Sequence, residues 1–412
     1  MSEKKNVPKL RFPEFTEPWE QRKLGDICSR VQGNDGRMNL PTLTISAANG
    51  WMNQEERFSG NIAGKEQKNY TLLHKGELSY NHGNSKLAKY GTVFSLQTYE
   101  EALVPRVYHS FRVENGSADF LEYYFATKLP DRELGRLISS GARMDGLLNI
   151  GYYEFMGIQM MFPTIAEQNQ IAGYFRCLDT LITLHQRKLD HVKNLKKSML
   201  QKMFPKNGQL YPEVRFPEFT DAWEQRKLGD VLVLLKDGTH GTHKDAESGP
   251  LLLSAKNIKN GTIQWDESDR RISEDEYNNI HSNFKLQKGD VLLTIVGSIG
   301  ETAILSQSKG VTFQRSVAFL RPSDKISSEF LYSEIQGQKF QKALNVRKST
   351  SAQPGIYLGD LGTIPIEFPT SDEEQMQIGS YFQNLDNLIT LHQRELDHLK
   401  LLKKGMLQQM FV

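Results

Sequence analysis

Apolar side chains recur at alternating steps of four and three residues over two long stretches of the chain. This spacing is the heptad seam of a coiled coil, because it keeps the apolar residues on one stripe of a helix. It predicts one helix from 165 to Met203, ending before Pro205 and roughly 57 Å long at 1.5 Å per residue, and a matching helix over 372–412. The seam positions are Ile171, Phe175, Leu178, Ile182, His185, Leu189, Val192, Lys196, Met199 and Met203 in the first helix and Ile378, Phe382, Leu385, Ile389, His392, Leu396, Leu399, Lys403, Met406 and Met410 in the second.

Both predicted helices are preceded by a start signal. Thr164 with Glu167, and Thr370 with Glu373, have the spacing of a capping box. In a capping box the hydroxyl and the carboxylate each accept a free backbone N–H of the first turn. We therefore expect one capping box at the beginning of each long helix.

The two seams have the same pattern, so we expect the helices to pair with each other. Two copies of one unit usually pair about a pseudo-two-fold axis, and an axis perpendicular to the helices makes them antiparallel. His185 and His392 interrupt the seams. We interpret them as polar residues that fix the register of the pair, while the alternative is a buried switch or a metal ligand.

The chain is an internal duplication. Residues 10–26 and 214–230 differ at 3 of 17 positions, and residues 175–204 and 382–411 differ at 8 of 30. The offset of about 205 residues is too long for a solenoid repeat. Each half therefore consists of an opening block, a variable stretch and a helical block.

The variable stretches, head 1 (27–163) and head 2 (231–369), share a skeleton beneath different loops. KGELSY (75–80) matches KGDVLL (288–293), and Arg106 and Arg112 match Arg315 and Arg321 at the same spacing. Alternation predicts strands at 92–96, 109–113, 291–296 and 316–320, and helices at 118–128 and 328–344. Regular βαβ order is absent, so we predict an α+β fold with a mixed or antiparallel sheet in each head.

Composition excludes several classes of protein. The chain has 412 residues, of which 38% are hydrophobic and 24% charged, so it can form packed cores in two or three domains. Its two cysteines cannot form a disulfide framework. No apolar run approaches 18 residues, and the polar N-terminus lacks the apolar core of a secretory signal, so we expect a cytoplasmic protein.

Charge and motifs do not indicate an enzyme. The largest basic excess lies in 164–204, with 7 basic and 3 acidic residues, and the net charge of the whole chain is +2. The pair His240 and His243 lacks an obvious third ligand, so no metal site is expected. No cofactor fingerprint or nucleophile motif is present. Two variable heads without catalytic chemistry are typical of an adaptor, because loops on a fixed scaffold usually set binding specificity.

The repeated blocks resemble the specificity subunit of Type I restriction–modification enzymes. The resemblance rests on RFPEF…W…KLGD before each head, on PTIAEQ (163–168) and its counterpart at 369–375, and on LKKSMLQKMF (195–204) and LKKGMLQQMF (402–411). It covers essentially the whole chain, and the near-identity of the opening blocks points to the Gram-positive branch of this family. The resemblance implies two α/β target recognition domains separated by an antiparallel coiled coil of two long helices.

The resemblance also implies a domain plan and a set of partners. Target recognition domains would span 1–163 and 205–371, and spacer helices 164–204 and 372–412. Each domain would recognise one half of a bipartite DNA target, and the helices would set the spacer and dock two methyltransferase subunits. Two restriction–translocation subunits would complete the enzyme. S-adenosylmethionine, ATP and Mg²⁺ would belong to these partners, and this chain would be non-catalytic.

The candidate DNA-binding residues are polar side chains in the variable loops. Arg and Lys suit guanine, Asn and Gln suit adenine, and hydroxyls are adaptable, whereas contacts to phosphate only set position. The candidates are Asn81, His82, Asn84, Ser85, Lys86, Lys89, Arg106 and Arg143 in head 1, and Lys236, Thr239, His240, Thr242, His243, Ser298, Arg315, Arg347, Lys348, Thr350, Ser351 and Gln353 in head 2. The alternative function is a two-headed protein-interaction scaffold. Loops rich in Arg, Lys, Asn, Ser and Thr, rather than in exposed aromatic residues, favour DNA.

Overall fold

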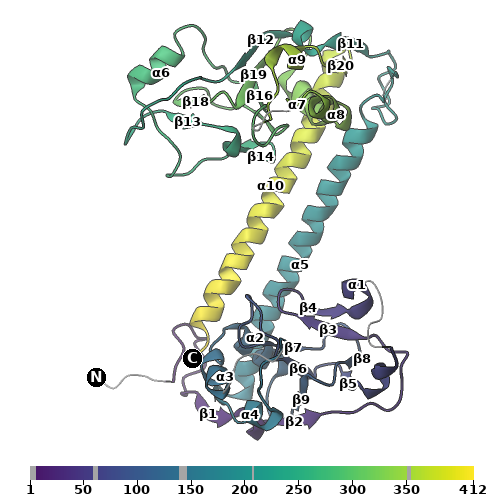
Figure 1. Cartoon of the computed structure of the whole chain (residues 1–412), viewed down its shortest axis with the longest axis vertical. Helices are drawn as coiled ribbons and strands as arrows, with labels where there is room; N and C mark the ends of the chain where they lie inside the picture. Colours follow the sequence, from purple (N-terminus) through teal and green to yellow (C-terminus); the bar gives the residue numbers. More distant parts are fainter. Residues whose placement is uncertain (1–5, 59–63, 139–145, 207, 350–353) are drawn as a thin grey trace. The chain divides into compact units, whose positions relative to one another are not determined.

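The structure, a computed structural model, describes residues 6–58, 64–138, 146–206, 208–349 and 354–412. The chain divides into two compact units, unit 1 with residues 1–184 and 396–412, and unit 2 with residues 185–395. Each unit contains one head and a part of each long helix, α5 (Ile165–Lys202) and α10 (Asp372–Gln409) (Figure 1). The described helices of the chain include none that combines the length and the apolar character needed to cross a membrane.

The starts of the long helices correct one prediction. The hydroxyl of Thr164 accepts the backbone N–H of Glu167 at 3.3 Å, as expected for α5. Before α10, however, the hydroxyl of Ser371 accepts the N–H of Glu374 at 3.3 Å, so the predicted pair Thr370 and Glu373 is wrong by one residue. The helical blocks are offset by 207 residues, and this offset aligns Thr164 with Ser371.

Within each unit α5 and α10 pack against each other in opposite directions. In unit 1 the ring of Phe175 lies 5.9 Å from that of Phe411, and farther along α5 the carboxylate of Asp179 contacts Lys403 Nζ at 2.5 Å. In unit 2 the ring centroids of His185 and His392 are 5.5 Å apart, and farther along α5 Lys196 Nζ contacts Asp386 Oδ1 at 2.5 Å. Partners on α10 move backwards as α5 advances, so the predicted antiparallel pairing is confirmed within each unit.

The apolar seam joins the helices to the heads. In unit 1, Ile171, Phe175 and Leu178 belong to the same core as the head, with Leu399 and Met406 partly buried against it. The equivalent core of unit 2 contains Val192, Met203, Ile378, Phe382 and Leu385. Of the remaining seam positions, Leu189 and Leu396 are buried, whereas Ile182, His185, Ile389 and His392 are partly exposed.

Each head is built on a four-stranded antiparallel sheet with the same strand order. In unit 1 the order is β2 (Cys28–Val31), β9 (His109–Val113), β6 (Leu78–Asn81) and β7 (Thr92–Ser95). In unit 2 it is β12 (Leu232–Asp237), β19 (Val317–Pro322), β16 (Val291–Thr294) and β17 (Thr302–Ile304). The shared scaffold inferred from the sequence skeleton is therefore present in both heads.

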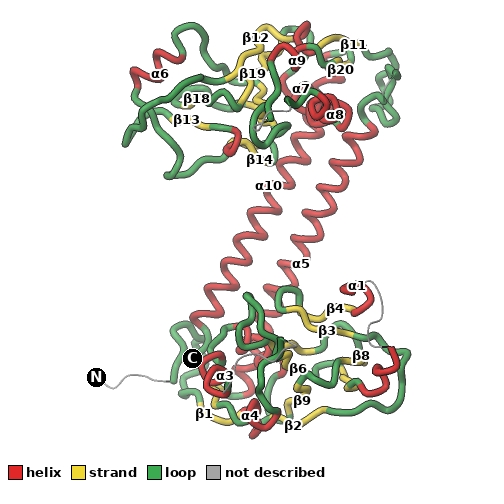
Figure 2. The backbone as a smooth tube through the Cα atoms, in the orientation of Figure 1, coloured by secondary structure: helices red, strands yellow, loops and turns green. Residues whose placement is uncertain are grey.

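The segments outside the central sheets carry shorter elements that differ between the heads (Figure 2). Head 1 has the antiparallel pairs β3–β4 and β5–β8, and head 2 has the parallel pair β13–β18 and the antiparallel pair β14–β15. These elements are β3 (Leu43–Ser46), β4 (Gly50–Asn53), α1 (Gln54–Phe58), β5 (Thr71–His74), β8 (Glu101–Val104), α3 (Asp131–Leu137) and α4 (Tyr152–Met156) in head 1, and β13 (Leu251–Leu253), β14 (Ile258–Lys259), β15 (Thr262–Ile263), α6 (Glu274–Ile280), β18 (Val311–Phe313), α8 (Gln338–Val346) and α9 (Leu358–Gly362) in head 2.

One helix follows each central sheet. α2 (Ala118–Ala126) and α7 (Ser328–Gln336) begin after Ser117 and Ser327, whose hydroxyls accept N–H groups of the first turn. The predicted helix 328–344 is instead two helices, because Gly337 has φ −57° and ψ 144°, which is extended backbone. A glycine loses more conformational entropy in a helix than any other non-proline residue, so a break is inexpensive at this position.

The opening blocks close each head at its base. β1 (Glu20–Lys23) pairs with β10 (Gln159–Phe162), and β11 (Glu224–Lys227) pairs with β20 (Pro365–Phe368), both antiparallel. Arg11 binds the buried carboxylate of Glu167 through two hydrogen bonds of 2.7 Å, and Trp19 Nε1 donates to the same carboxylate at 3.4 Å. The equivalent trio of Arg215, Trp223 and Glu374 is present in unit 2. These contacts tie the opening block to the first turn of the long helix that follows the head.

Candidate nucleic-acid interface

The loop after β6 in head 1 contains most of the predicted residues of that head. Its backbone lies against 146–148, because Asn84 N–H donates to Gly146 O at 3.0 Å and Leu148 N–H donates to His82 O at 2.8 Å. Four candidates, Asn84, Ser85, Lys86 and Lys89, are exposed. The loop therefore presents two ammonium groups, an amide and a hydroxyl to solvent.

The last residue of β6, Asn81, and the first residue of this loop, His82, are engaged within the head. The side-chain amide of Asn81 donates to Ile45 O at 3.2 Å and accepts the N–H of Gly83 at 3.0 Å. His82 is 6% exposed, and its ring centroid lies 4.9 Å from that of His109. Burial lowers the pKa of His109, whose Nε2 contacts Ile150 O at 2.8 Å. These contacts fix the base of the loop.

The two matched arginine pairs of the skeleton have different environments. Arg112 binds Glu77 and Arg321 binds Asp290, and both carboxylates are almost completely buried. These ion pairs raise the pKa of each guanidinium, and they join β9 or β19 to the residue that directly precedes β6 or β16. Arg106 and Arg315 are exposed, and so is Arg112; what distinguishes Arg112 and Arg321 is the ion pair with a buried carboxylate. Of the two matched arginines in each head, the first is the one that no buried carboxylate holds in place.

In head 2 the candidates of the β12–β13 loop form a hydrogen-bonded group. Thr239 Oγ1 lies 2.9 Å from His243 Nε2, and the other ring nitrogen of His243 lies 2.5 Å from a carboxylate oxygen of Glu276. His240 is exposed, with Nε2 at 2.7 Å from Asp237 Oδ2. Thr242 is also exposed, whereas Lys236 lies partly buried with Nζ 5.0 Å from the ring centroid of Phe284.

Other segments of head 2 bring further candidates close to Thr239. Arg315 N–H donates to Thr239 O at 3.0 Å. Ser316 Oγ accepts the N–H of Ala255 at 3.0 Å, and the carbonyl of Ala255 accepts from Ser298 Oγ at 3.4 Å. Thr239, Arg315 and Ser298 are thus linked through three neighbouring loops, although they are far apart in the sequence.

The remaining candidates lie at the end of α8 or outside the described residues. Arg347 caps this helix, with Nη1 donating to Ala343 O at 3.1 Å, and Lys348 is partly exposed beside it. Arg143, Thr350, Ser351 and Gln353 fall outside the residues that the structure describes. Throughout the described chain, no group of three or more His, Cys, Asp or Glu side chains could hold a metal ion.

A second pair of sites was missed in the sequence. In unit 1 the hydroxyl of Tyr123 donates to Asp179 at 2.7 Å, and Lys403 binds the other oxygen of this carboxylate. In unit 2, Tyr332, Asp386 and Lys196 make the same contacts. Each trio joins one head helix to both long helices. The signal available in the sequence was the aspartate itself, which is identical in LDTLITLHQR and LDNLITLHQR.

Comparisons with known proteins agree with this arrangement. Residues 220–401 match the family model of the Type I restriction modification DNA specificity domain. The chain is 25% identical over 97% of its length to the Type I restriction enzyme MjaVIII specificity subunit of Methanocaldococcus jannaschii, covering 93% of that protein. It is 26% identical, again over 97% of its length, to the putative MjaX specificity subunit of the same organism, covering 94% of it.

A solved structure has the same fold. The crystal structure of a Type I restriction–modification S subunit from M. genitalium superposes with a TM-score of 0.63, at 13% identity, over 98% of this chain and 99% of that chain. The fold is therefore that of two α/β heads with two long helices packed together in each unit.

These observations define a DNA specificity protein of a restriction–modification system. In sequence and in fold the chain is similar to the specificity subunits of Type I restriction enzymes, and its residues 220–401 match their DNA specificity domain. The two M. jannaschii relatives are archaeal and give no support to the expected Gram-positive branch.

Proposed function

We propose that each head recognises one half of a bipartite DNA target, and that the long helices set the spacing between the halves and dock two methyltransferase subunits. The observation that carries this proposal is the contrast between scaffold and loops. Strand order, the Arg–carboxylate pair and the trios at the helices repeat in both units. The loops at the same edges differ in length and in chemistry, so two copies of one frame present two different surfaces.

The exposed loop residues supply the chemistry that base recognition requires. Guanidinium and ammonium groups suit guanine and phosphate, and amides and hydroxyls suit the other base edges. Within this proposal, two restriction–translocation subunits join the methyltransferase subunits in the cytoplasm. S-adenosylmethionine, ATP and Mg²⁺ are cofactors of these partner subunits. The domains are those proposed from the sequence, with recognition domains at 1–163 and 205–371 and spacer helices at 164–204 and 372–412.

A head exchange tests the two-part model. Residues 27–163 are replaced by the corresponding stretch of another specificity subunit, and methylated sites are mapped in cells that also express the partner subunits. One half-site should change while the other half-site and the spacer stay the same. The matched exchange of 231–369 should change the other half. If either exchange altered both half-sites in a folded protein, the two-reader model would be wrong.

Single substitutions test the arginines. If the side chain contacts a base, Arg106→Ala or Arg315→Ala should weaken DNA binding by about 1–3 kcal/mol and relax the specificity of one half-site. If it contacts phosphate, the substitution should weaken binding to all sequences equally and reduce the salt dependence of binding. Arg112→Ala and Arg321→Ala are the matched controls, because they remove arginines whose carboxylate partners are buried. They should lower the melting temperature without changing the recognised sequence.

The alternative function is a two-headed protein scaffold. A gel-shift assay with mixed DNA fragments, with and without a methyltransferase subunit, separates the two. Complexes that need a specific DNA sequence support DNA recognition, and complexes that form equally on every fragment contradict it.

A further inference from the structure

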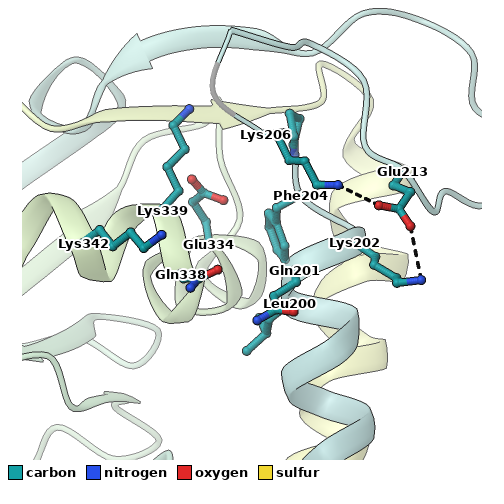
Figure 3. A pocket seen from close by; sticks show the side chains of 12 residues that line it. Leu200, Gln201, Lys202, Phe204, Lys206, Glu213, Glu334, Gln338, Lys339 and Lys342 are labelled. Atoms are coloured by element: carbon teal, nitrogen blue, oxygen red, sulfur yellow. Dashed lines mark hydrogen bonds and ion pairs between the residues drawn. The ribbon is translucent and has the colours of Figure 1, made fainter.

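A cavity of about 580 Å³ lies in unit 2 between the end of α5 and the junction of α7 and α8 (Figure 3). Its apolar wall is formed by Leu200, Phe204 and Pro205, and the side chain of Glu334 projects between this wall and α8. All of these residues belong to unit 2. The cavity lies apart from the predicted DNA-binding loops, and the proposed DNA recognition leaves it without a role.

The equivalent place in unit 1 is filled by the side chain of Tyr124. The helices α2 and α7 align at their serine caps, and this alignment pairs Tyr124 with Glu334. The ring of Tyr124 stacks on Phe411, with centroids 5.5 Å apart and an interplanar angle of 26°. Its hydroxyl accepts the N–H of Met161 at 3.0 Å and donates to Val412 O at 2.9 Å. The tyrosine therefore packs one face of the ring and satisfies an amide of β10.

In unit 2 the residues around this position are similar, but Glu334 stands in place of Tyr124 and brings no aromatic ring. The carboxyl of Glu334 accepts the N–H of Glu367 in β20, just as Tyr124 accepts the amide of β10. Phe204 corresponds to Phe411 and packs against Trp223, Phe330 and Phe382.

In unit 1, Phe411 packs against the three corresponding rings, which are those of Trp19, Phe120 and Phe175. It also packs against a fourth ring, that of Tyr124. Among the described residues of unit 2, no ring takes the place of this fourth neighbour. The cavity is thus bounded by an aromatic side chain whose counterpart in unit 1 is covered by a phenol.

The rim of the cavity is basic. Lys202 and Lys206 lie on one side, 3.2 and 2.8 Å from the carboxylate oxygens of Glu213, and Lys339 and Lys342 lie on α8 (Figure 3).

Burial and the neighbouring Glu367 raise the pKa of Glu334 to about 8, so this carboxyl is mostly protonated near neutral pH. Four ammonium groups then line the cavity. Glu213 pairs with Lys202 and Lys206, and Glu367 pairs with Lys339, so the two carboxylates leave a net positive charge, with Lys342 outside these ion pairs. A ligand that carries negative charge is favoured at such a rim.

We propose that this cavity binds a tyrosine side chain presented by an acidic segment of a partner protein. The ring would stack on Phe204 as Tyr124 stacks on Phe411, and the phenol hydroxyl would hydrogen-bond to the carboxyl of Glu334. Acidic residues beside the tyrosine would face Lys206 and Lys342. Unit 1 shows that a tyrosine fits these surroundings, because its own Tyr124 occupies the place that is empty in unit 2.

The test uses the full chain and a blocked Glu-Tyr-Glu peptide, titrated by ligand-observed NMR. Saturable binding is expected for this peptide, and binding at least about tenfold weaker for the blocked Glu-Ala-Glu and Lys-Tyr-Lys peptides, which lack the ring or the charge. Glu334→Tyr should reduce binding of Glu-Tyr-Glu by about tenfold or more, because the new side chain would fill the cavity as Tyr124 does. This variant places in unit 2 a residue that unit 1 already accommodates in the same surroundings.

A second variant leaves the core unchanged. Lys206→Glu combined with Lys342→Glu alters two exposed side chains, and it should weaken binding of Glu-Tyr-Glu and strengthen that of Lys-Tyr-Lys. Unchanged melting temperatures would verify that both proteins are folded. Equal binding of the tyrosine and alanine peptides, no saturable binding at all, or an unchanged affinity in the double variant would each overturn the proposal.

Discussion

Replacing Asp386 by alanine is expected to destabilise unit 2 more than Asp179→Ala destabilises unit 1, although the two trios have the same chemistry. In unit 2, Asp386 accepts hydrogen bonds from Tyr332 at 2.7 Å and Lys196 at 2.5 Å. In unit 1, Asp179 accepts from a tyrosine and a lysine at the same distances. In each case the substitution leaves the phenol hydroxyl without this acceptor and removes the carboxylate that binds the lysine.

Exposure makes the difference between the two sites. The side chains of Lys196 and Asp386 are 13% and 15% exposed, whereas those of Lys403 and Asp179 are 25% and 34% exposed. Removing one partner of a buried ion pair costs about 3–5 kcal/mol, because the other charge is left uncompensated. Exposed pairs contribute about 0–1 kcal/mol, since water replaces the partner.

Interpolation between these limits gives the expected magnitudes. We expect a loss of about 2–4 kcal/mol for Asp386→Ala and about 1–2 kcal/mol for Asp179→Ala. The carbonyl of the Gln336 side chain also accepts from Lys196 at 2.5 Å. Because this acceptor remains after Asp386→Ala, the expected loss of stability stays below the limit of about 5 kcal/mol for a buried pair.

Hydrogen exchange measured by mass spectrometry on the full chain locates each loss. Peptides from α7 should gain exchange in Asp386→Ala, and peptides from α2 should gain less in Asp179→Ala. Asp386→Asn is the matched control, because it keeps an acceptor for the tyrosine and removes only the charge. A loss of protection in α2 equal to or larger than that in α7 would refute the argument from exposure.

Three further outcomes are expected. Burial and the neighbouring His185 lower the pKa of His392 below its ordinary value of 6.5, so the unfolded state binds the proton more readily than the folded state. The stability of unit 2 should therefore fall as the pH drops below 6.5. Urea unfolding of His392→Leu should show no such pH dependence. The pKa of Glu334 is raised to about 8 from an ordinary 4.5, so the stability that its protonated form contributes to the folded state is lost as the pH rises from 4.5 to 8. In Glu334→Gln the free energy of unfolding should depend less on pH over that range, and an unchanged pH dependence would contradict the burial argument. The purified chain alone should neither methylate nor cleave DNA in a radiolabelled-methyl and gel assay, and methyl transfer without another subunit would contradict its assignment.

The parts predicted correctly from the sequence were those that repeat locally. The heptad seam needs only the spacing of residues such as Phe175 and Leu178, and the shared head scaffold needs only the matching segments around Glu77 and Asp290. The cap at Ser371 was misplaced because Thr370 has the same chemistry one residue earlier. Only the alignment of the two helical blocks distinguishes them.

Other features depend on contacts that no local pattern contains. Glu374 has the spacing of a capping residue, but its carboxylate binds Arg215 and Trp223 from more than 150 residues earlier. His82 looked like a loop residue available to DNA, yet it is almost fully buried against other rings. The cavity beside Phe204 exists because of what is missing relative to the other unit, and this difference becomes visible only when the two folded copies are compared.

The tyrosines of the two trios do not occupy aligned positions. By the alignment of α2 and α7 at their serine caps, Tyr123 corresponds to Ser333, and Tyr332 corresponds to Glu122. The phenol that meets the long helix has therefore moved by one helical position, while its bond to the aspartate has kept the same 2.7 Å length. We therefore expect a transplanted head to fit a resident helix pair when it brings a hydroxyl to the aspartate of that pair. Donor heads for chimeric specificity subunits should be chosen for a tyrosine at either of these two adjacent positions.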